Sequence, residues 1–307
     1  MGTWTTRDIP DLSGKTVVIT GGNSGLGFES AKALAHRGAD VILACRSSER
    51  GESARGEILA HLAHAKVHAM TLDLQDLASV ASFATKFSED FGRLDILMNN
   101  AGIMNTPYGL TKDGFESQLG TNHLGHFVLT GQLLDVLKST AGSRVVTVSS
   151  SAHRAGTMKF DNLLFQNGTG YTPLKAYGRS KLANLLFTYE LQRQFARHDI
   201  GSISTAAHPG ASQTNLGRHI EHTLPFRVFN PLLRRVVQGS ERGALSQLRA
   251  AVSPEVCGGH YYGPDGHFGM SGYPVLVRSS RASYSLDDAE KLWRESERLT
   301  GITYQFS

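Results

Sequence analysis

The sequence predicts an α/β fold, in which a doubly wound parallel sheet is flanked by helices on both faces. Short runs of β-branched and other apolar residues alternate with longer segments of helical period along most of the 307 residues. Parallel strands buried on both faces have this continuous apolar character, and each needs a crossover to reach the next. No repeat, low-complexity tract or linker divides the chain. We therefore expect a single domain over residues 1–307, with a core at about 14–266.

The first expected strand, Thr16–Thr20, runs into Gly21-x-x-x-Gly25-x-Gly27 and then into a helix that ends near Gly38. Glycines allow a sharp turn and bring backbone N–H groups close to a pyrophosphate, which the positive end of the following helix attracts. A tight loop would explain the glycines alone. Their position directly after the first strand instead favours a Rossmann-type dinucleotide-binding unit.

The second expected strand, Asp40–Cys45, is followed by Arg46. An acidic residue at this strand end would bind ribose hydroxyls and repel a 2′-phosphate. The chain has Cys45 there, and Arg46 can hold a phosphate through two parallel hydrogen bonds. A solvated loop arginine is the alternative. We predict NADP(H) rather than NAD(H).

The remaining elements follow the same alternation. We expect helices over 49–63, 77–91, 115–137 and 240–251, one that opens at Ala176, and a C-terminal helix within 285–300; strands are expected over 66–72, 94–98, 144–148 and 201–207.

Polar residues at strand ends are candidates for ligand binding. Asp73 and Leu74 follow the third strand, where the carboxylate could accept the adenine amino group, although Asp73 or Asp76 could equally cap the next helix. Asn99-Asn100-Ala101-Gly102 follows the fourth strand and suits the crevice where doubly wound folds bind ligands.

Three further positions carry chemistry. Asn122 is a poor residue for the interior of the helix expected over 115–137, and it either bends the helix or is placed for catalysis. The fifth strand ends in serines at 149, 150 and 151. Tyr177 and Lys181 are four residues apart and so share a helix face, although such a pair is more often simply exposed.

After the sixth strand, Pro209 and Gly210 begin a loop that contains Thr214. Residues 215–237 are apolar and basic together, which suits a substrate lid, a membrane-surface helix or an oligomer contact. Pro225 and Pro231 divide this segment into short pieces. They favour a lid at about 211–240.

Composition excludes several classes of function. The net charge is +4 and the pI about 9.1, without a run of five like charges, so we expect no nucleic-acid partner and no polybasic membrane anchor. Cys45 and Cys257 do not form a disulfide framework, and we expect no metal site, because the pair His219 and His222 lacks a third ligand. No apolar run reaches transmembrane length. We expect a cytoplasmic protein.

Together these residues resemble the short-chain dehydrogenase/reductase superfamily from about Gly14 to Gly266. The matching motifs are Thr20-Gly21-x3-Gly25-x-Gly27, Asn99-Asn100-Ala101-Gly102, Asn122, Ser150, Tyr177-x3-Lys181 and Pro209-Gly210, in the family's order. Ala44-Cys45-Arg46, Ala152-His153 and Leu292-Trp293-x-x-Ser296-Glu297 are similar to the branch of retinol dehydrogenases and related carbonyl reductases. The interval from Ser150 to Tyr177 is longer than the commonest family spacing, an insertion that also occurs in this branch.

The resemblance implies an NADP(H)-dependent oxidoreductase of carbonyls and alcohols. Tyr177 would be the general acid or base, and Lys181 would lower its pKa and hold the nicotinamide ribose. Ser150 would polarise the carbonyl, and Asn122 would hold a water in a proton relay. The expected cofactor contacts are Gly21, Asn23, Ser24, Gly25, Leu26, Gly27, Arg46, Asp73, Leu74, Asn100, Ala101, Gly102, Tyr177, Lys181, Pro209, Gly210 and Thr214.

The resemblance leaves the substrate open. We expect a fairly apolar small molecule, whose pocket the loop after Ser150 and the segment after Thr214 would shape. Reduction of an activated C=C bond at the same site is an alternative, as is a catalytically silent NADP(H)-binding regulator. A homodimer or homotetramer also stays open.

Overall fold

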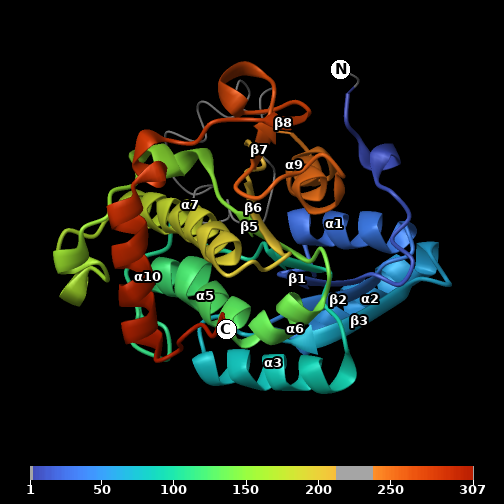
Figure 1. Cartoon of the computed structure of the whole chain (residues 1–307), viewed down its shortest axis with the longest axis horizontal. Coiled ribbons are helices and arrows are strands. Elements are labelled where there is room, and N and C mark those ends of the chain that lie inside the picture. Colours follow the sequence, from blue (N-terminus) through green and yellow to red (C-terminus); the bar gives the residue numbers. More distant parts are fainter. Residues whose placement is uncertain (1–2, 212–237, 307) are drawn as a thin grey trace.

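Within residues 3–211 and 238–306, which the computed structural model describes, eight strands form one sheet in the order β3-β2-β1-β4-β5-β6-β7-β8 (Figure 1). The strands are β1 Thr16–Thr20, β2 Asp40–Cys45, β3 Lys66–Thr71, β4 Ile96–Asn99, β5 Arg144–Val148, β6 Ile203–Ala207, β7 Tyr261–Pro264 and β8 Pro274–Leu276. The helices are α1 Gly25–His36, α2 Ser48–His61, α3 Leu77–Asp90, α4 Ser117–Leu119, α5 Gly125–Gln132, α6 Leu134–Ser139, α7 Pro173–Arg197, α9 Ser240–Val252 and α10 Leu286–Thr300.

The predicted fold class is confirmed, with one difference at the edge of the sheet. Strands β1 to β7 pair in parallel, whereas β8 pairs antiparallel with β7; neither β7 nor β8 was predicted as a strand. The connection over residues 265–273 is too short for the crossover that a parallel partner needs, so the chain returns as a hairpin.

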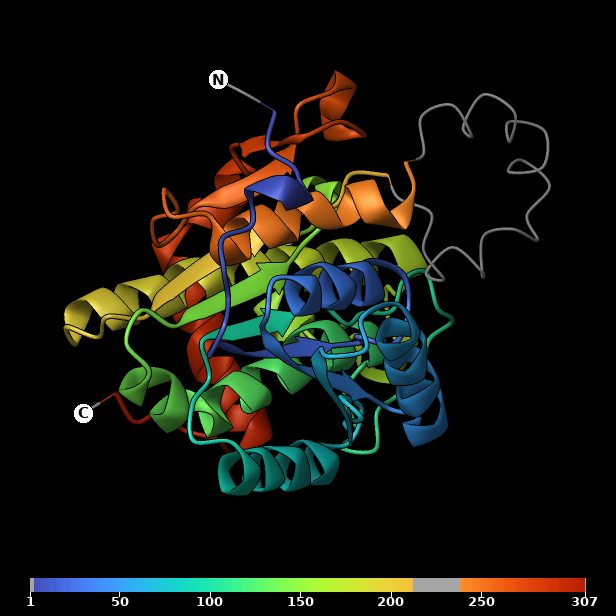
Figure 2. The same cartoon turned by 90° about the vertical axis from the view of Figure 1, so that its right-hand side faces the viewer.

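The sheet is buried on both faces, as its apolar strands predict. Val17 and Ile19 pack against α1, α2 and α9, and the intervening Val18 packs against α3, α5 and α7. Figure 2 shows α1 and α9 on one side of the sheet and α3 and α5 on the other. This three-layer arrangement brings the carboxyl ends of the parallel strands to one edge.

The long helix expected over 115–137 is not continuous. The Glu116 carboxylate accepts hydrogen bonds from the backbone N–H groups of Gln118 and Leu119, at 2.8 Å each, and so caps α4. A π-helical turn over Gly120–Leu124 follows and contains Asn122. Asn122 therefore lies in a distorted turn, which is what its poor helix propensity indicated.

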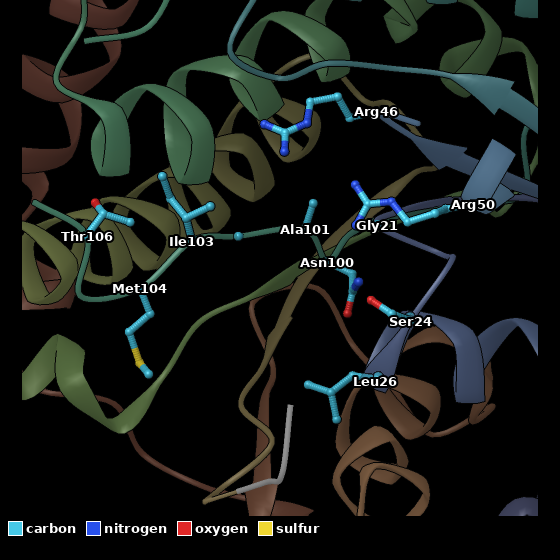
Figure 3. A pocket seen from close by; sticks show the side chains of 13 residues that line it. Gly21, Ser24, Leu26, Arg46, Arg50, Asn100, Ala101, Ile103, Met104 and Thr106 are labelled. Atoms are coloured by element: carbon cyan, nitrogen blue, oxygen red, sulfur yellow. The ribbon is translucent and has the colours of Figure 1, made fainter. Parts of the chain in front are cut away.

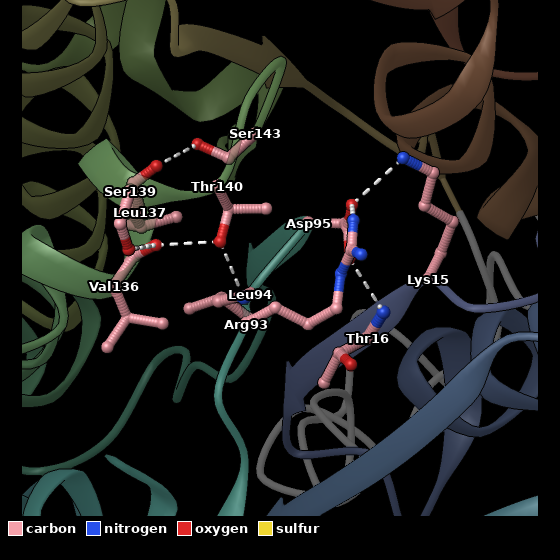
Figure 4. A network of polar contacts seen from close by, with 10 residues as sticks. All are labelled: Lys15, Thr16, Arg93, Leu94, Asp95, Val136, Leu137, Ser139, Thr140 and Ser143. Carbon is pink, nitrogen blue, oxygen red and sulfur yellow. Dashed lines mark hydrogen bonds and ion pairs between the residues drawn. The ribbon is translucent and has the colours of Figure 1, made fainter.

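A buried carboxylate, Asp95, joins the amino ends of β1 and β4 (Figure 4). Asp95 accepts hydrogen bonds from the Thr16 backbone N–H at 2.9 Å, from Lys15 Nζ at 3.0 Å and from Arg93 Nη2 at 2.7 Å. Burial alone would raise the pKa of Asp95, but these donors, Arg93 foremost, hold it below its usual value.

The loop between Ser150 and α7 is folded onto the domain. Leu163 is buried, and Phe160 and Leu164 pack beside it against residues of α7 and α10. The Arg179 guanidinium lies 3.9 Å from the centre of the Phe165 ring and donates to the main-chain oxygens of residues 162 and 163. The insertion is therefore an ordered part of the domain.

Among the helices that the structure describes, none combines the length and the apolar character needed to cross a membrane.

Candidate active site

The turn between β1 and α1 accepts only glycine at three places. Gly21 and Gly25 have φ values of +66° and +53°, which disfavour a side chain. At Gly27 a Cβ would lie 2.4 Å from the main-chain oxygen of Gly21. At these three glycines no side chain covers the backbone of the turn, which is therefore bare. The turn faces a cavity of about 330 Å³ (Figure 3).

Expected cofactor residues surround this cavity and an adjoining one. The first is lined by Gly21, Ser24, Gly25, Leu26, Gly27, Arg46, Asn100, Ala101 and Gly102, among others. The second, of about 220 Å³, is lined by Asn23, Arg46, Asp73, Leu74, Ala101 and Gly102, among others. Residues from the ends of β1, β2, β3 and β4 thus meet at one edge of the sheet, as expected for a doubly wound fold.

Arg50 is a candidate that the sequence analysis missed. It lines both cavities together with Arg46, and Figure 3 shows the two side chains extending toward the same space. The Ser47 hydroxyl accepts a 3.2 Å hydrogen bond from the Arg50 N–H, which places Arg50 in the first turn of α2. A second basic residue in that first turn, four positions after Arg46, was the available signal.

The two alternatives for the third strand end separate in the structure. Asp76 caps α3, because its Oδ1 accepts from the N–H groups of Ala78 at 3.1 Å and Ser79 at 3.4 Å. Asp73 instead accepts from the Gln75 N–H at 3.0 Å, within its own turn, and lines the second cavity. Asp76 is therefore the helix cap, and Asp73 lines the cavity.

The loop after β4 is held against the glycine turn. Thr20 Oγ1 accepts hydrogen bonds from the N–H groups of Asn100 and Ala101, both at 2.9 Å. The Asn100 side chain returns a bond, from Nδ2 to the Thr20 oxygen, at 2.7 Å. These contacts bring the Asn100–Gly102 segment to the wall of both cavities.

Asn122 and Lys181 meet at Gly102. A Cβ on Gly102 would lie 3.1 Å from Asn122 Oδ1 and 3.4 Å from Lys181 Nζ. Asn122 Nδ2 also donates to Ser180 Oγ at 2.9 Å, and that hydroxyl donates to the Tyr177 main-chain oxygen at 2.8 Å. The missing side chain at Gly102 therefore leaves room where the cavity wall meets these polar groups.

The three adjacent serines have different environments. Ser149 is buried, and its hydroxyl donates to the Lys181 main-chain oxygen at 2.8 Å. The Ser150 side chain acts on Tyr177, whose pKa it lowers. It also accepts from the Ala152 N–H at 3.2 Å. The structure thus pairs Tyr177 with Ser150, the second serine of the run.

The sequence analysis expected Lys181 to lower the pKa of Tyr177. In the protein without a cofactor this expectation is wrong, because the pKa is raised. Burial raises the pKa of Tyr177 above its usual value, and the interaction with Ser150 offsets this only in part. Lys181 Nζ lies 5.8 Å from the centre of the Tyr177 ring. The loss of hydration of the buried phenolate therefore sets the direction of the shift.

Lys181 itself is enclosed rather than solvated. Its side chain is 4 % exposed, and Nζ donates to the Val148 main-chain oxygen at 3.0 Å. Burial lowers the pKa of Lys181 from 10.5 to about 8, because the charged form loses its hydration.

The expected loop after β6 is described only at its start. Gly210 has a φ of +68°, and a Cβ there would lie 2.3 Å from the Met270 oxygen. The Pro209 oxygen accepts from Gln238 Nε2 at 2.7 Å. Thr214 and the rest of 212–237, most of the lid expected at 211–240, lie outside the described residues.

Comparisons with known proteins agree with this arrangement. Residues 15–225 match the short chain dehydrogenase family. The chain is 41 % identical to human retinol dehydrogenase 13 over 298 residues, which are 95 % of this chain and 86 % of that protein. It is 43 % identical to human retinol dehydrogenase 11 over 253 residues, 82 % of this chain and 77 % of that protein.

A solved structure of an uncharacterized protein from Mycobacterium paratuberculosis superposes with a TM-score of 0.81 and 42 % identity, covering 99 % of this chain and 100 % of that one. The family match, the relatives and the shared fold cover nearly the whole described chain. The chain belongs to the short-chain dehydrogenase/reductase family of oxidoreductases and is similar, within it, to the retinol dehydrogenases.

Proposed function

We propose that this protein is an NADP(H)-dependent oxidoreductase that interconverts a carbonyl and an alcohol on a fairly apolar small molecule. One observation carries the proposal. Asn122 Oδ1 and Lys181 Nζ lie beside Gly102, which lines both cavities at the glycine turn, and Tyr177 stands one turn before Lys181 on the same face of α7.

The residues around the cavities fit a dinucleotide with an additional phosphate. The bare turn offers backbone N–H groups, and Ser24 at the start of α1 makes no capping hydrogen bond with its side chain. Arg46 and Arg50 supply two guanidinium groups where β2 ends, and the last residue of that strand is Cys45 rather than an acidic residue. When bound, NADPH supplies the hydride.

Tyr177 acts as the general acid in reduction. Its raised pKa keeps the phenol protonated at neutral pH, so it is ready to donate a proton to the substrate oxygen. Ser150 donates a hydrogen bond where negative charge develops on that oxygen. The raised pKa favours reduction over oxidation, since oxidation would need the phenolate.

Lys181 and Asn122 support the return of the proton. With a pKa of about 8, Lys181 is mostly an ammonium at pH 7 and can hand a proton on without a large energetic penalty. Asn122 lies in the π-helical turn with its amide hydrogen-bonded to the Ile103 main chain and to Ser180 Oγ, next to the space at Gly102. In our proposal a water bound there restores the proton.

The apolar nature of the substrate is suggested by two observations. Ile103 and Met104 line the larger cavity beside Gly102. The relatives are named retinol dehydrogenases, and retinol is a long apolar alcohol. We therefore place retinal and other apolar aldehydes first among the candidate substrates.

The test is NADPH consumption with a panel of apolar aldehydes, including retinal, and of ketones, quinones and enones. Turnover of aldehydes or ketones supports the proposal. Turnover of enones alone would instead assign C=C reduction to the same site. NADPH binding without turnover of any panel member would point to a regulatory protein.

A further inference from the structure

His126 lies between two parts of the site that are far apart in sequence. Its side chain is buried in α5, one helical turn after Asn122. Its Nδ1 lies 3.1 Å from the Asn122 main-chain oxygen, and its Nε2 lies 2.8 Å from Thr20 Oγ1. The imidazole thus spans from the π-helical turn to the start of the glycine turn.

The partners of His126 determine which nitrogen carries the proton. A carbonyl oxygen only accepts, so Nδ1 must carry the hydrogen and donate it to Asn122. Nε2 is then the acceptor for the Thr20 hydroxyl. With its hydrogen committed to Nε2, the Thr20 oxygen is left to accept from Asn100 and Ala101, as the two 2.9 Å bonds show.

We propose that His126 is a positioning residue, which couples the catalytic turn at Asn122 to the cofactor-binding loop at Asn100–Gly102 through Thr20. The proposal rests on the function proposed above. The neutral imidazole with hydrogen on Nδ1 satisfies every polar group in the chain of contacts.

The surroundings keep His126 in that form. It is enclosed in the protein, and burial lowers its pKa to about 4, with the nearby Lys181 ammonium acting in the same direction. An imidazolium would place a second hydrogen between Nε2 and Thr20. The Thr20 hydroxyl would then have to turn its own hydrogen toward the Met98 oxygen, 3.3 Å away.

Two substitutions separate the two contacts of His126. His126→Asn places an amide nitrogen near the position of Nδ1, which keeps a donor for the Asn122 oxygen but does not reach Thr20. His126→Gln places its terminal oxygen near the position of Nε2, which keeps an acceptor for Thr20 but removes the donor to Asn122.

We expect the two variants to fail in different ways. His126→Asn should weaken NADPH binding by about fivefold, the loss of one hydrogen bond, and speed amide hydrogen exchange at Asn100 and Ala101. His126→Gln should keep the NADPH Kd and the amide exchange within about twofold of the unmodified protein. It should lower kcat for carbonyl reduction by about tenfold, because displacing a catalytic group slows the reaction.

His123 provides a matched control. It is also a buried histidine of this region, but its Nε2 contacts Ser296 Oγ in α10 at 2.9 Å rather than the site. His123→Gln should lower Tm without changing the NADPH Kd or the exchange of the Asn100 and Ala101 amides.

The proposal is overturned if both His126 variants match the unmodified protein in NADPH Kd, amide exchange and kcat. It is also overturned if a lower Tm is the only change in both variants, as is expected for His123→Gln. NADPH Kd and amide exchange need no turnover, so they test His126 even where no carbonyl is reduced and the proposed function fails. If the variants do not fold, ¹⁵N NMR of the unmodified protein decides, since a hydrogen on Nε2 of neutral His126 contradicts the proposal.

Discussion

The Nζ of Lys181 donates a 3.0 Å hydrogen bond to the main-chain oxygen of Val148, at the carboxyl end of β5. Asn184 Nδ2 donates to the same oxygen, also at 3.0 Å. The Val148 oxygen therefore accepts from two donors, and it keeps the Asn184 donor if the lysine is removed. The charge of Lys181 is costly inside the protein, because burial lowers its pKa to about 8. Stability and catalysis therefore make opposite demands at this position.

Lys181→Met should abolish carbonyl reduction and stabilise the fold at pH 7. The pKa of Lys181 falls from 10.5 to about 8 on folding, so burying the charge costs up to about 3 kcal/mol. Asn184 still satisfies the Val148 oxygen. Denaturant unfolding at pH 7 measures the gain.

The stabilisation by Lys181→Met has a defined pH dependence. Between pH about 8 and 10.5 the folded protein with Lys181 binds fewer protons than the unfolded chain, so its stability rises with pH through that window. The difference between the two proteins should shrink accordingly. A difference that is constant from pH 7 to pH 10 would contradict the buried charge.

The pH profile of carbonyl reduction should follow Lys181 rather than Tyr177. We expect kcat to be nearly level below pH 7 and to fall as pH rises through about 8, where Lys181 loses its proton. The phenol stays protonated across this range, because its pKa is raised by burial. A profile that is level to pH 10 would remove Lys181 from the proton path.

Tyr177→Phe should lower turnover by at least about a hundredfold, the low end for a lost acid–base group, with the NADPH Kd nearly unchanged. Tyr189→Phe is the matched control, because this buried tyrosine of the same helix bonds to Ser279 Oγ, at 2.8 Å, instead of Ser150. Steady-state kinetics and fluorescence titration measure both. Equal turnover of Tyr177→Phe and the unmodified protein would refute the assigned role.

Arg46→Ala and Arg50→Ala should each weaken NADPH binding by about tenfold or more and leave NADH nearly unaffected, because only NADPH carries the 2′-phosphate. Arg55→Ala serves as the control. Arg55 lies on α2 but donates to the Val67 oxygen at 2.8 Å and pairs with Glu52. Equal losses for both cofactors, measured by titration, would reverse the NADP(H) assignment.

Asp95→Asn should reduce the free energy of unfolding by about 2 kcal/mol, the scale of hydrogen bonds to a charged group, without altering NADPH binding. Its partners Thr16, Lys15 and Arg93 lie at the amino edge of the sheet, away from the site (Figure 4). Urea unfolding compares the two proteins.

The contribution of Asp95 should also disappear in acid. Because its pKa is lower in the folded protein than the usual 3.8, the stabilisation is present above about pH 4 and is lost as pH falls through the folded-state pKa. If Asp95→Asn is as stable as the unmodified protein at pH 7, the carboxylate does not hold the strands together.

Features that depend only on neighbouring residues could be predicted from the sequence. The apolar run Thr16–Thr20 has few ways to be buried except as a central strand, and its side chains do alternate between the two faces. The positive φ values of Gly21 and Gly25 are local backbone requirements that only glycine meets easily. Tyr177 and Lys181 share a face of α7 because helical periodicity demands it.

Tertiary structure alone decided which of several chemically equivalent groups is used. Ser149 and Ser150 are the same residue type side by side, and the contact of Ser149 with the Lys181 oxygen is what leaves Ser150 to Tyr177. The direction of the Tyr177 pKa shift depends on how much water the whole fold excludes, which no spacing reveals.

The link from Asn122 through His126 to Thr20 likewise joins residues about a hundred positions apart. The sequence pattern within a segment indicates the conformation that the segment prefers. Burial and hydrogen-bond partners are set by segments distant in the chain, so they exist only once the sheet and its helices have assembled.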